Sequence, residues 1–127
     1  MMKKYLIFAA MSGMIAVVLG AFGAHGLKEV LSPEKLNSFS TGVRYQMMHS
    51  LLLILVGSIS LISAKAKKTT ALFLVIGMIA FSGSIYLLTL GWIPSKYFWF
   101  VTPLGGLFLI LAWCVLLFSL VKSKVAD

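Results

Sequence analysis

Four long stretches of the chain hold mostly apolar side chains and no charged residue, and short polar segments join them. The uncharged stretches cover residues 5–27, 45–64, 69–95 and 97–121. Each is long enough for an α-helix to cross a hydrocarbon core, which takes roughly 20 residues for a thickness of about 30 Å. No water satisfies backbone amides there, so helices are the spanning form to expect. The pattern predicts an all-α membrane protein with one domain over 1–127, a bundle of four transmembrane helices at about 5–26, 43–64, 70–91 and 98–121.

The segment between the first two stretches has a helical pattern of its own. Ser32 is suited to cap a helix, Pro33 to occupy its first position, and Glu34 to face the positive end of the helix dipole. Apolar side chains then recur at helical spacing at Leu36, Phe39, Val43 and Met47. This pattern predicts a short amphipathic helix in the first outer loop, bending near Gly42 into the second spanning helix.

The first stretch also resembles a secretory signal. Lys3 and Lys4 make a positive start, and 21–23 could serve as a weak cleavage site. The apolar run is longer than a usual signal core of about 7–15 residues. We therefore expect a retained transmembrane helix.

Composition excludes a water-soluble globule, because only 11% of the residues are charged and 61% are hydrophobic. Soluble domains carry about 25% charged residues. The net charge of +8 does not indicate nucleic acid, since the lysines lie in short groups between the apolar stretches rather than among aromatic side chains. The partner that this pattern predicts is the lipid bilayer.

Basic residues are divided unequally between the segments on the two sides. With the N-terminus inside, the inner segments hold Lys3, Lys4, Lys65, Lys67, Lys68, Lys122 and Lys124, and the outer ones hold Lys28, Lys35, Arg44 and Lys96. Cytoplasmic segments carry the excess of lysine and arginine. This division predicts a multi-pass protein with both termini in the cytoplasm.

Strong polar side chains gather where the helices approach the outer side. Helix-rise arithmetic predicts an outer-leaflet polar cluster of His25, Tyr45, Gln46, His49, Ser82, Ser84, Tyr86 and Thr102. Ionisable groups inside a membrane are functional candidates, and histidine exchanges a proton near neutral pH. The structural alternative is that His25 lies among the lipid head groups and His49 donates one hydrogen bond across the bundle.

Small residues recur on three of the predicted helices. The candidate helix-packing glycines are Gly13, Gly20, Gly23, Gly77, Gly83, Gly105 and Gly106. Small side chains let transmembrane helices approach closely, which favours packing. A second interpretation is that these glycines bring backbone carbonyls close to a bound ligand.

Several chemistries lack the residues that they need. Two histidines with no carboxylate or thiolate at the same depth make a poor metal site, and Cys114 is the only cysteine. There is no carboxylate pair and no phosphate-binding glycine-lysine motif. We predict no metal and no cofactor.

Four segments carry a resemblance to a known family. They are Gly-Ala-Phe-Gly-Ala-His-Gly at 20–26, Tyr-Gln-Met-Met-His at 45–49, Phe-Ser-Gly-Ser-Ile-Tyr-Leu at 81–87, and Thr-Pro-Leu-Gly-Gly at 102–106 with Trp113. These segments resemble the YgdD/YwdK-type family of small bacterial membrane proteins, over all four helices in order. The resemblance implies a protein of the bacterial plasma (inner) membrane, from a family with no established activity, ligand or cofactor.

Three hypotheses for the function follow. The first is a non-enzymatic structural or accessory membrane protein, whose polar cluster fastens the bundle or binds a partner such as a second copy or another membrane protein. The alternative is a small-molecule or proton-coupled transport unit, acting as an oligomer because four short helices enclose little space. The third is a membrane enzyme acting on a lipid or quinone near the outer leaflet.

Overall fold

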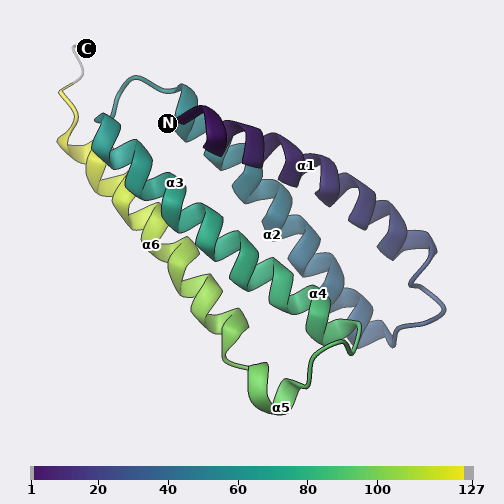
Figure 1. Ribbon diagram of the computed structural model, residues 1–127. Helices are drawn as coiled ribbons and strands as arrows, with labels where there is room; N and C mark the ends of the chain where they lie inside the picture. Colours follow the sequence, from purple (N-terminus) through teal and green to yellow (C-terminus); the bar gives the residue numbers. More distant parts are fainter. Residues whose placement is uncertain (1, 125–127) are drawn as a thin grey trace.

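The computed structural model describes residues 2–124, and all regular structure in that range is helical (Figure 1). The elements are α1 (Met2–His25), α2 (Pro33–Ser58), α3 (Ala64–Met78), the π-helical turn η1 (Ile79–Gly83), α4 (Ser84–Thr89), α5 (Ser95–Phe98) and α6 (Val101–Lys122). α3, η1 and α4 follow one another without a break and form one long rod, which we call the α3–α4 rod.

The four long rods lie side by side in a row rather than around a common centre (Figure 1). α1 packs mainly against α2, α2 packs against the α3–α4 rod, and α6 packs against α3 and η1. α1 and the α3–α4 rod run in one direction, and α2 and α6 run in the other (Figure 1). The outer faces of α1 and α6 are apolar, with Val17 62% and Phe118 62% exposed. Lipid can cover such faces, so a membrane protein does not need to close its helices into a ring.

Three of these rods are long and apolar enough to cross a membrane: Met2–His25, Ala64–Thr89 and Ser95–Lys122. These correspond to the first, third and fourth predicted spans. α2 corresponds to the second, but it is not among the three. Its first half carries Glu34, Lys35 and Arg44, and its uncharged part begins only at Tyr45.

The predicted start of α2 is confirmed, but the separate helix in the first outer loop is not. Ser32 Oγ accepts a hydrogen bond from the backbone N–H of Lys35 at 3.3 Å, and Pro33 is the first helical residue. From there a single helix runs to Ser58. Gly42 lies inside it, where a Cβ would come within 3.0 Å of the Tyr86 ring. The absence of a side chain at Gly42 therefore allows close packing and does not mark a bend in the helix.

Helix boundaries differ from the predicted ones where charges lie inside a helix. α2 ends at Ser58 rather than at 64, and α3 begins at Ala64 rather than at 70. Ser63 caps α3, since its Oγ accepts from the backbone N–H of Ala66 at 3.1 Å. The first turns of α3 thus contain lysines, and the hydrophobic pattern marks the apolar part of the helix instead of its ends.

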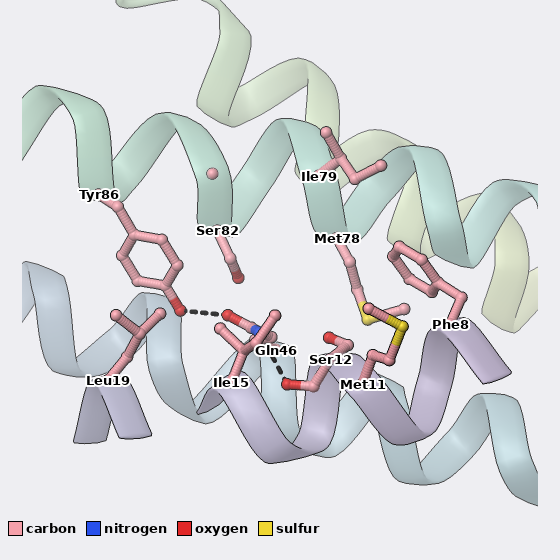
Figure 2. Close-up of a pocket in the computed structure, with 11 residues that line it drawn as sticks. Phe8, Met11, Ser12, Ile15, Leu19, Gln46, Met78, Ile79, Ser82 and Tyr86 are labelled. Atoms are coloured by element: carbon pink, nitrogen blue, oxygen red, sulfur yellow. Dashed lines mark hydrogen bonds between the residues drawn. The ribbon is translucent and has the colours of Figure 1, made fainter. Parts of the chain in front are cut away.

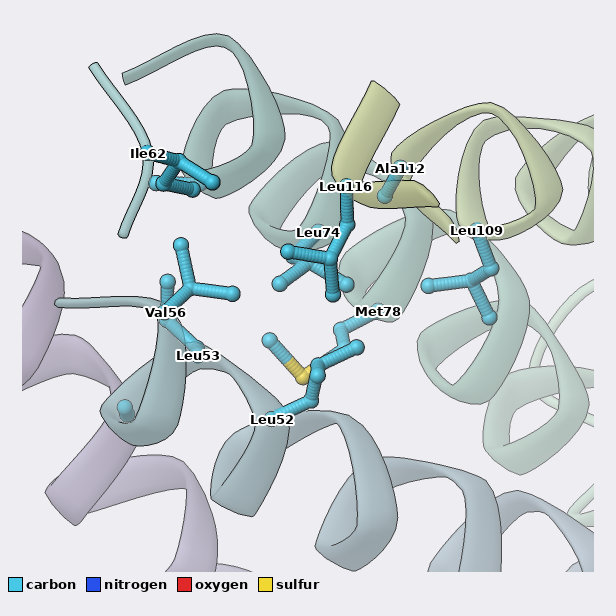
Figure 3. Packing of buried hydrophobic residues seen from close by; sticks show 11 residues of the cluster. Leu52, Leu53, Val56, Ile62, Leu74, Met78, Leu109, Ala112 and Leu116 are labelled. Atoms are coloured by element: carbon cyan, nitrogen blue, oxygen red, sulfur yellow. The ribbon is translucent and has the colours of Figure 1, made fainter. Parts of the chain in front are cut away.

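The apolar core lies where α2, α3 and α6 meet (Figure 3). Leu53, Leu74 and Ala112 from these three helices are each 0% exposed. The buried cluster consists of Ala9, Leu52, Leu53, Val56, Ile62, Ala71, Leu74, Met78, Leu109, Ala112 and Leu116. Its alanines allow close approach, as expected of helices that associate within lipid.

Two of the candidate packing glycines lie where α6 crosses the α3–α4 rod. A Cβ on Gly105 would be 2.3 Å from the backbone nitrogen of Phe81, and one on Gly77 would be 2.6 Å from Leu109 Cδ2. At Gly105 the obstacle is the backbone of η1 itself, which cannot rotate away as a side chain can. Only glycine fits there without moving α6.

The other candidate glycines differ in how closely they are packed. On α1, a Cβ on Gly23 would be 3.1 Å from the Phe39 ring, whereas Gly20 and Gly13 have ordinary contacts at 3.5 and 4.0 Å. On α6, Gly106 also has an ordinary contact, at 3.6 Å. A Cβ on Gly83 would meet no atom within 4 Å.

We predict that Gly105→Ala lowers the free energy of unfolding by about 1–3 kcal/mol, the usual range for overpacking a close contact. Gly83→Ala is the matched control on the opposing rod. It adds the same methyl group in open space and should leave stability unchanged or raise it slightly. Thermal unfolding of both variants in detergent is the measurement. Equal melting temperatures for the two variants would contradict the close approach of α6 to η1.

Candidate functional site

Gln46 of α2 joins three helices through its side-chain amide (Figure 2). Its Nε2 donates a hydrogen bond to the backbone carbonyl of Ser12 on α1 at 2.8 Å. Its Oε1 accepts one from the hydroxyl of Tyr86 on α4 at 2.5 Å. The residue is only 7% exposed, so both ends of the amide are paired inside the protein.

Ser50 extends this set one helical turn along α2. Its Oγ lies 2.7 Å from the backbone carbonyl oxygen of Gln46 and 2.8 Å from Ser12 Oγ. A hydroxyl group has one proton and two lone pairs. Ser50 and Ser12 can therefore satisfy each other and the Gln46 carbonyl at once, and no hydroxyl in this set needs water.

His49 points away from this set and toward α6. Its Nε2 accepts a hydrogen bond from Trp113 Nε1 at 3.1 Å, and its Nδ1 lies 2.8 Å from the backbone carbonyl of Tyr45. An indole N–H only donates and a carbonyl only accepts. These partners assign the proton to Nδ1 and none to Nε2, which is the neutral ring. A second proton on Nε2 would face the Trp113 N–H, so the arrangement does not suit a proton relay.

Two further hydrogen bonds link the α3–α4 rod to its neighbours. Ser82 Oγ donates to the backbone carbonyl of Gly42 on α2 at 2.7 Å. Ser84 Oγ and Thr102 Oγ1 lie 2.5 Å apart, and either can be the donor. Thr102 is in the first turn of α6, so this pair fixes the start of α6 beside α4.

The structure distributes the eight candidate residues over separate contacts rather than one network. Gln46 and Tyr86 belong to the set with Ser12, whereas the Ser84–Thr102 bond stands apart from it. The Tyr45 ring contacts the Phe81 ring, with centroids 4.7 Å apart. The backbone carbonyl of Tyr45 accepts the hydrogen bond from His49 Nδ1. The described contacts of the chain include no hydrogen bond from the side chain of His25, which is exposed at the end of α1.

Sequence reasoning missed four partners in these contacts: Ser12, Ser50, the carbonyl of Gly42, and Trp113 as the donor to His49. One signal was available, because Ser50 follows Gln46 by four residues and so shares its helix face. Nothing in the sequence pairs Trp113 with His49, since they come from helices far apart along the chain.

The set around Gln46 lies near the middle of α1 and α2. Ser12 is ten residues from Met2, so it lies about 15 Å along α1 and near the middle of that helix. The helix-rise prediction measures depth along the second helix from Arg44. Because α2 already begins at Pro33, Gln46 is well inside the helical rod.

A hollow of about 320 Å³ opens beside the Gln46 set, between α1 and the α3–α4 rod (Figure 2). It is lined by Phe8, Met11, Ser12, Ile15, Leu19, Gln46, Met78, Ile79, Ser82, Gly83 and Tyr86. A second hollow of about 670 Å³ shares Leu19, Gly83 and Tyr86 with it and continues to Trp92. Both are predominantly apolar, which suits an acyl chain better than water.

Within residues 2–124, no group of three or more histidine, cysteine or acidic side chains lies close enough to hold a metal ion. The described carboxylates, Glu29 and Glu34, lie in and just after the link between α1 and α2. Cys114 is free and half-buried on α6. The site therefore offers amide, hydroxyl, imidazole and indole groups that are already paired with one another.

Apolar rods long enough to span a membrane, joined by buried hydrogen bonds, define a small helical integral membrane protein. The family model for a protein of unknown function (DUF423) matches residues 19–106. The chain is 36% identical over 124 residues to a UPF0382 membrane protein of Haemophilus influenzae, covering 98% of both chains. It is 38% identical over 123 residues to the UPF0382 membrane protein YwdK of Bacillus subtilis, covering 95% of this chain and 98% of the relative.

A further relative is the UPF0382 inner membrane protein YgdD of Escherichia coli, 35% identical over 125 residues, with 94% of this chain and 90% of the relative covered. The chain belongs to this DUF423/UPF0382 family of membrane proteins. The resemblance found from the sequence segments is thereby confirmed. No solved structure matches the chain.

We predict that the Gln46 and Tyr86 side chains contribute to stability as a pair. Gln46→Leu leaves the Tyr86 hydroxyl unpaired and should lower the free energy of unfolding by about 1–3 kcal/mol. In the double variant with Tyr86→Phe, the unpaired hydroxyl is gone, so the loss should be smaller than the sum of the single losses by about 0.5–2 kcal/mol. Unfolding in mixed micelles measures these differences.

The control cycle combines Gln46→Leu with Ser84→Ala, since Ser84 belongs to the separate contact with Thr102. The losses in free energy of unfolding from these two substitutions should be additive. Additivity in both cycles would contradict the Gln46–Tyr86 bond.

Proposed function

We propose that this protein is a non-catalytic structural or accessory protein of the membrane, in which the polar side chains hold the helices in register. The observation that carries this proposal is that the cluster's polar groups use one another as partners. Gln46, His49 and Ser84 each bond across a helix interface. A catalytic or transporting site needs groups left available for a substrate, and such groups are few here.

The transport alternative receives less support from the same contacts. The hydrogen-bonded sets around Gln46 and His49 face different neighbours, α1 with α4 in one case and α6 in the other. Neither contains a charged side chain, whereas ion pathways in membranes are marked by ionisable groups. A transport unit would therefore require several copies of the chain to build a continuous polar path.

We further propose four membrane crossings with both termini in the cytoplasm of a bacterial cell. The direction of the rods supports the fourth crossing. α1 and the α3–α4 rod run in the same direction, so the chain has to return between them, and α2 is the segment that lies antiparallel between them (Figure 1). The lysine-rich starts of α1 and α3 lie at the same end as the end of α6, which supports a cytoplasmic position for that end.

Topology can be tested with single cysteines in a Cys114→Ala background. Lys68→Cys lies at the start of α3 and Lys96→Cys lies in α5, at opposite ends of the α3–α4 rod. We expect a membrane-impermeant maleimide to label Lys96→Cys in intact cells, and Lys68→Cys only after the membrane is opened. Labelling of both or of neither in intact cells would contradict an odd number of crossings between them, and the reverse pattern would overturn the orientation.

The structural role predicts that His49→Leu acts through protein abundance. Losing the Trp113 bond should lower the melting temperature in detergent by several degrees, with a proportional loss of the protein from membranes. His25→Leu is the matched control, because His25 is exposed at the end of α1. Each variant is expressed in a gene-deletion strain, and competitive growth under membrane stress is compared with its abundance. A growth defect of His49→Leu at normal abundance and stability would contradict the structural role and favour a reactive site.

A further inference from the structure

One end of the molecule is strongly basic. The starts of α1 and α3 and the end of α6 come together there, as Figure 1 shows. They carry Lys3, Lys4, Lys65, Lys67, Lys68, Lys122 and Lys124. The described carboxylates, Glu29 and Glu34, belong to the α1–α2 link and the start of α2, at the opposite end. No acidic side chain among residues 2–124 therefore neutralises these lysines locally.

A cleft of about 520 Å³ lies within this basic end, between the starts of α1 and α3 and the end of α2. Its walls are Met2, Tyr5, Gly57, Ala64, Lys65, Lys67 and Lys68. Gly57 lets α1 lie directly on the end of α2, since a Cβ there would be 2.6 Å from Leu6 Cδ2. The cleft is thus built by a close contact of two helices and is bordered by three ammonium groups.

Backbone N–H groups add to the positive electrostatic character of the cleft. In the first turn of α3, Ser63 accepts the N–H groups of Ala66 and Lys67. The N–H groups of Ala64 and Lys65 precede the regular helical pattern, and the described contacts assign them no acceptor. The start of a 15-residue helix also carries the positive end of its dipole. Lysine side chains and helix amides are both suited to a phosphate oxygen.

We propose that this cleft binds the phosphate of an anionic phospholipid head group. Lipid is favoured over free phosphate because apolar and aromatic groups continue the site toward the membrane. Met2 and Tyr5 of α1 line it beside the lysines. Tyrosine is also typical of the boundary between head groups and hydrocarbon. Basic clefts between helix ends on the cytoplasmic side bind anionic lipids by this combination.

The proposal is independent of the packing role of the Gln46 and His49 contacts, and the proposed orientation decides only which leaflet supplies the lipid. Native mass spectrometry of the whole protein in mild detergent tests it, with titrated phosphatidylglycerol and phosphatidylcholine. We expect one saturable site that binds phosphatidylglycerol more tightly. The double variant Lys67→Gln/Lys68→Gln should weaken that site roughly 25-fold, since each of the two lysines near an anionic surface is worth roughly fivefold.

The matched control removes two charges from the same end but outside the cleft, with Lys122→Gln/Lys124→Gln. It should leave phosphatidylglycerol affinity within about twofold of the parent, a difference below roughly 0.4 kcal/mol. Lys67→Arg/Lys68→Arg should retain binding, and unchanged melting temperatures would show that the variants are folded.

Three results would overturn the proposal. The first is equal binding of the two lipids. The second is equal loss in both glutamine double variants, which would show attraction to the whole basic end. The third concerns the source of the phosphate: inorganic phosphate, added at millimolar concentration without lipid, would raise the melting temperature as much as phosphatidylglycerol does.

Discussion

A side-chain amide buried among helices has no water to bond with, and this constraint organises the centre of the molecule. Gln46 meets it by bonding to the Ser12 carbonyl of α1 and the Tyr86 hydroxyl of α4. An unpaired polar group in an apolar environment costs several kcal/mol. The position of α1 against α2, and of α4 against both, is therefore constrained by one residue. Apolar packing alone would constrain it less, since lipid tails are as apolar as the side chains.

Other buried polar side chains in the described part of the chain are also hydrogen-bonded across helix interfaces. His49 holds α6 through Trp113, Ser82 holds α2 through the Gly42 carbonyl, and Ser84 and Thr102 join α4 to α6. Only Thr70 Oγ1 is buried without a hydrogen-bond partner among residues 2–124. Close packing complements these bonds where backbones meet, above all at Gly105 against η1. Directional bonds and tight glycine contacts thus supplement the apolar core in holding the helices together.

Sequence reasoning predicted the helical class, three of the apolar rods and the family, because these depend on the local composition of long stretches. It also predicted the start of α2, because the capping signal at Ser32 and Pro33 is local. It failed at Gly42, where a glycine that seemed to mark a bend in fact makes room for Tyr86. The pairing of His49 with Trp113 could not be predicted, since it depends on how α2 and α6 are placed. The polar candidate residues can be read from the sequence, but their hydrogen-bond partners depend on the tertiary structure.

α2 is the least apolar of the long helices because its first half carries Glu34, Lys35 and Arg44 and its second half carries the buried Gln46 and His49. It lies between α1 and the α3–α4 rod and reaches α6 through His49, so protein covers it on several sides. Its polar side chains, Gln46, His49 and Ser50, are all buried against those neighbours. Hydropathy measures how well a helix suits lipid, and a helix that faces protein does not need to suit lipid. The same reasoning accounts for the strongly apolar outer helices, α1 and α6, whose exposed faces have lipid as their main partner.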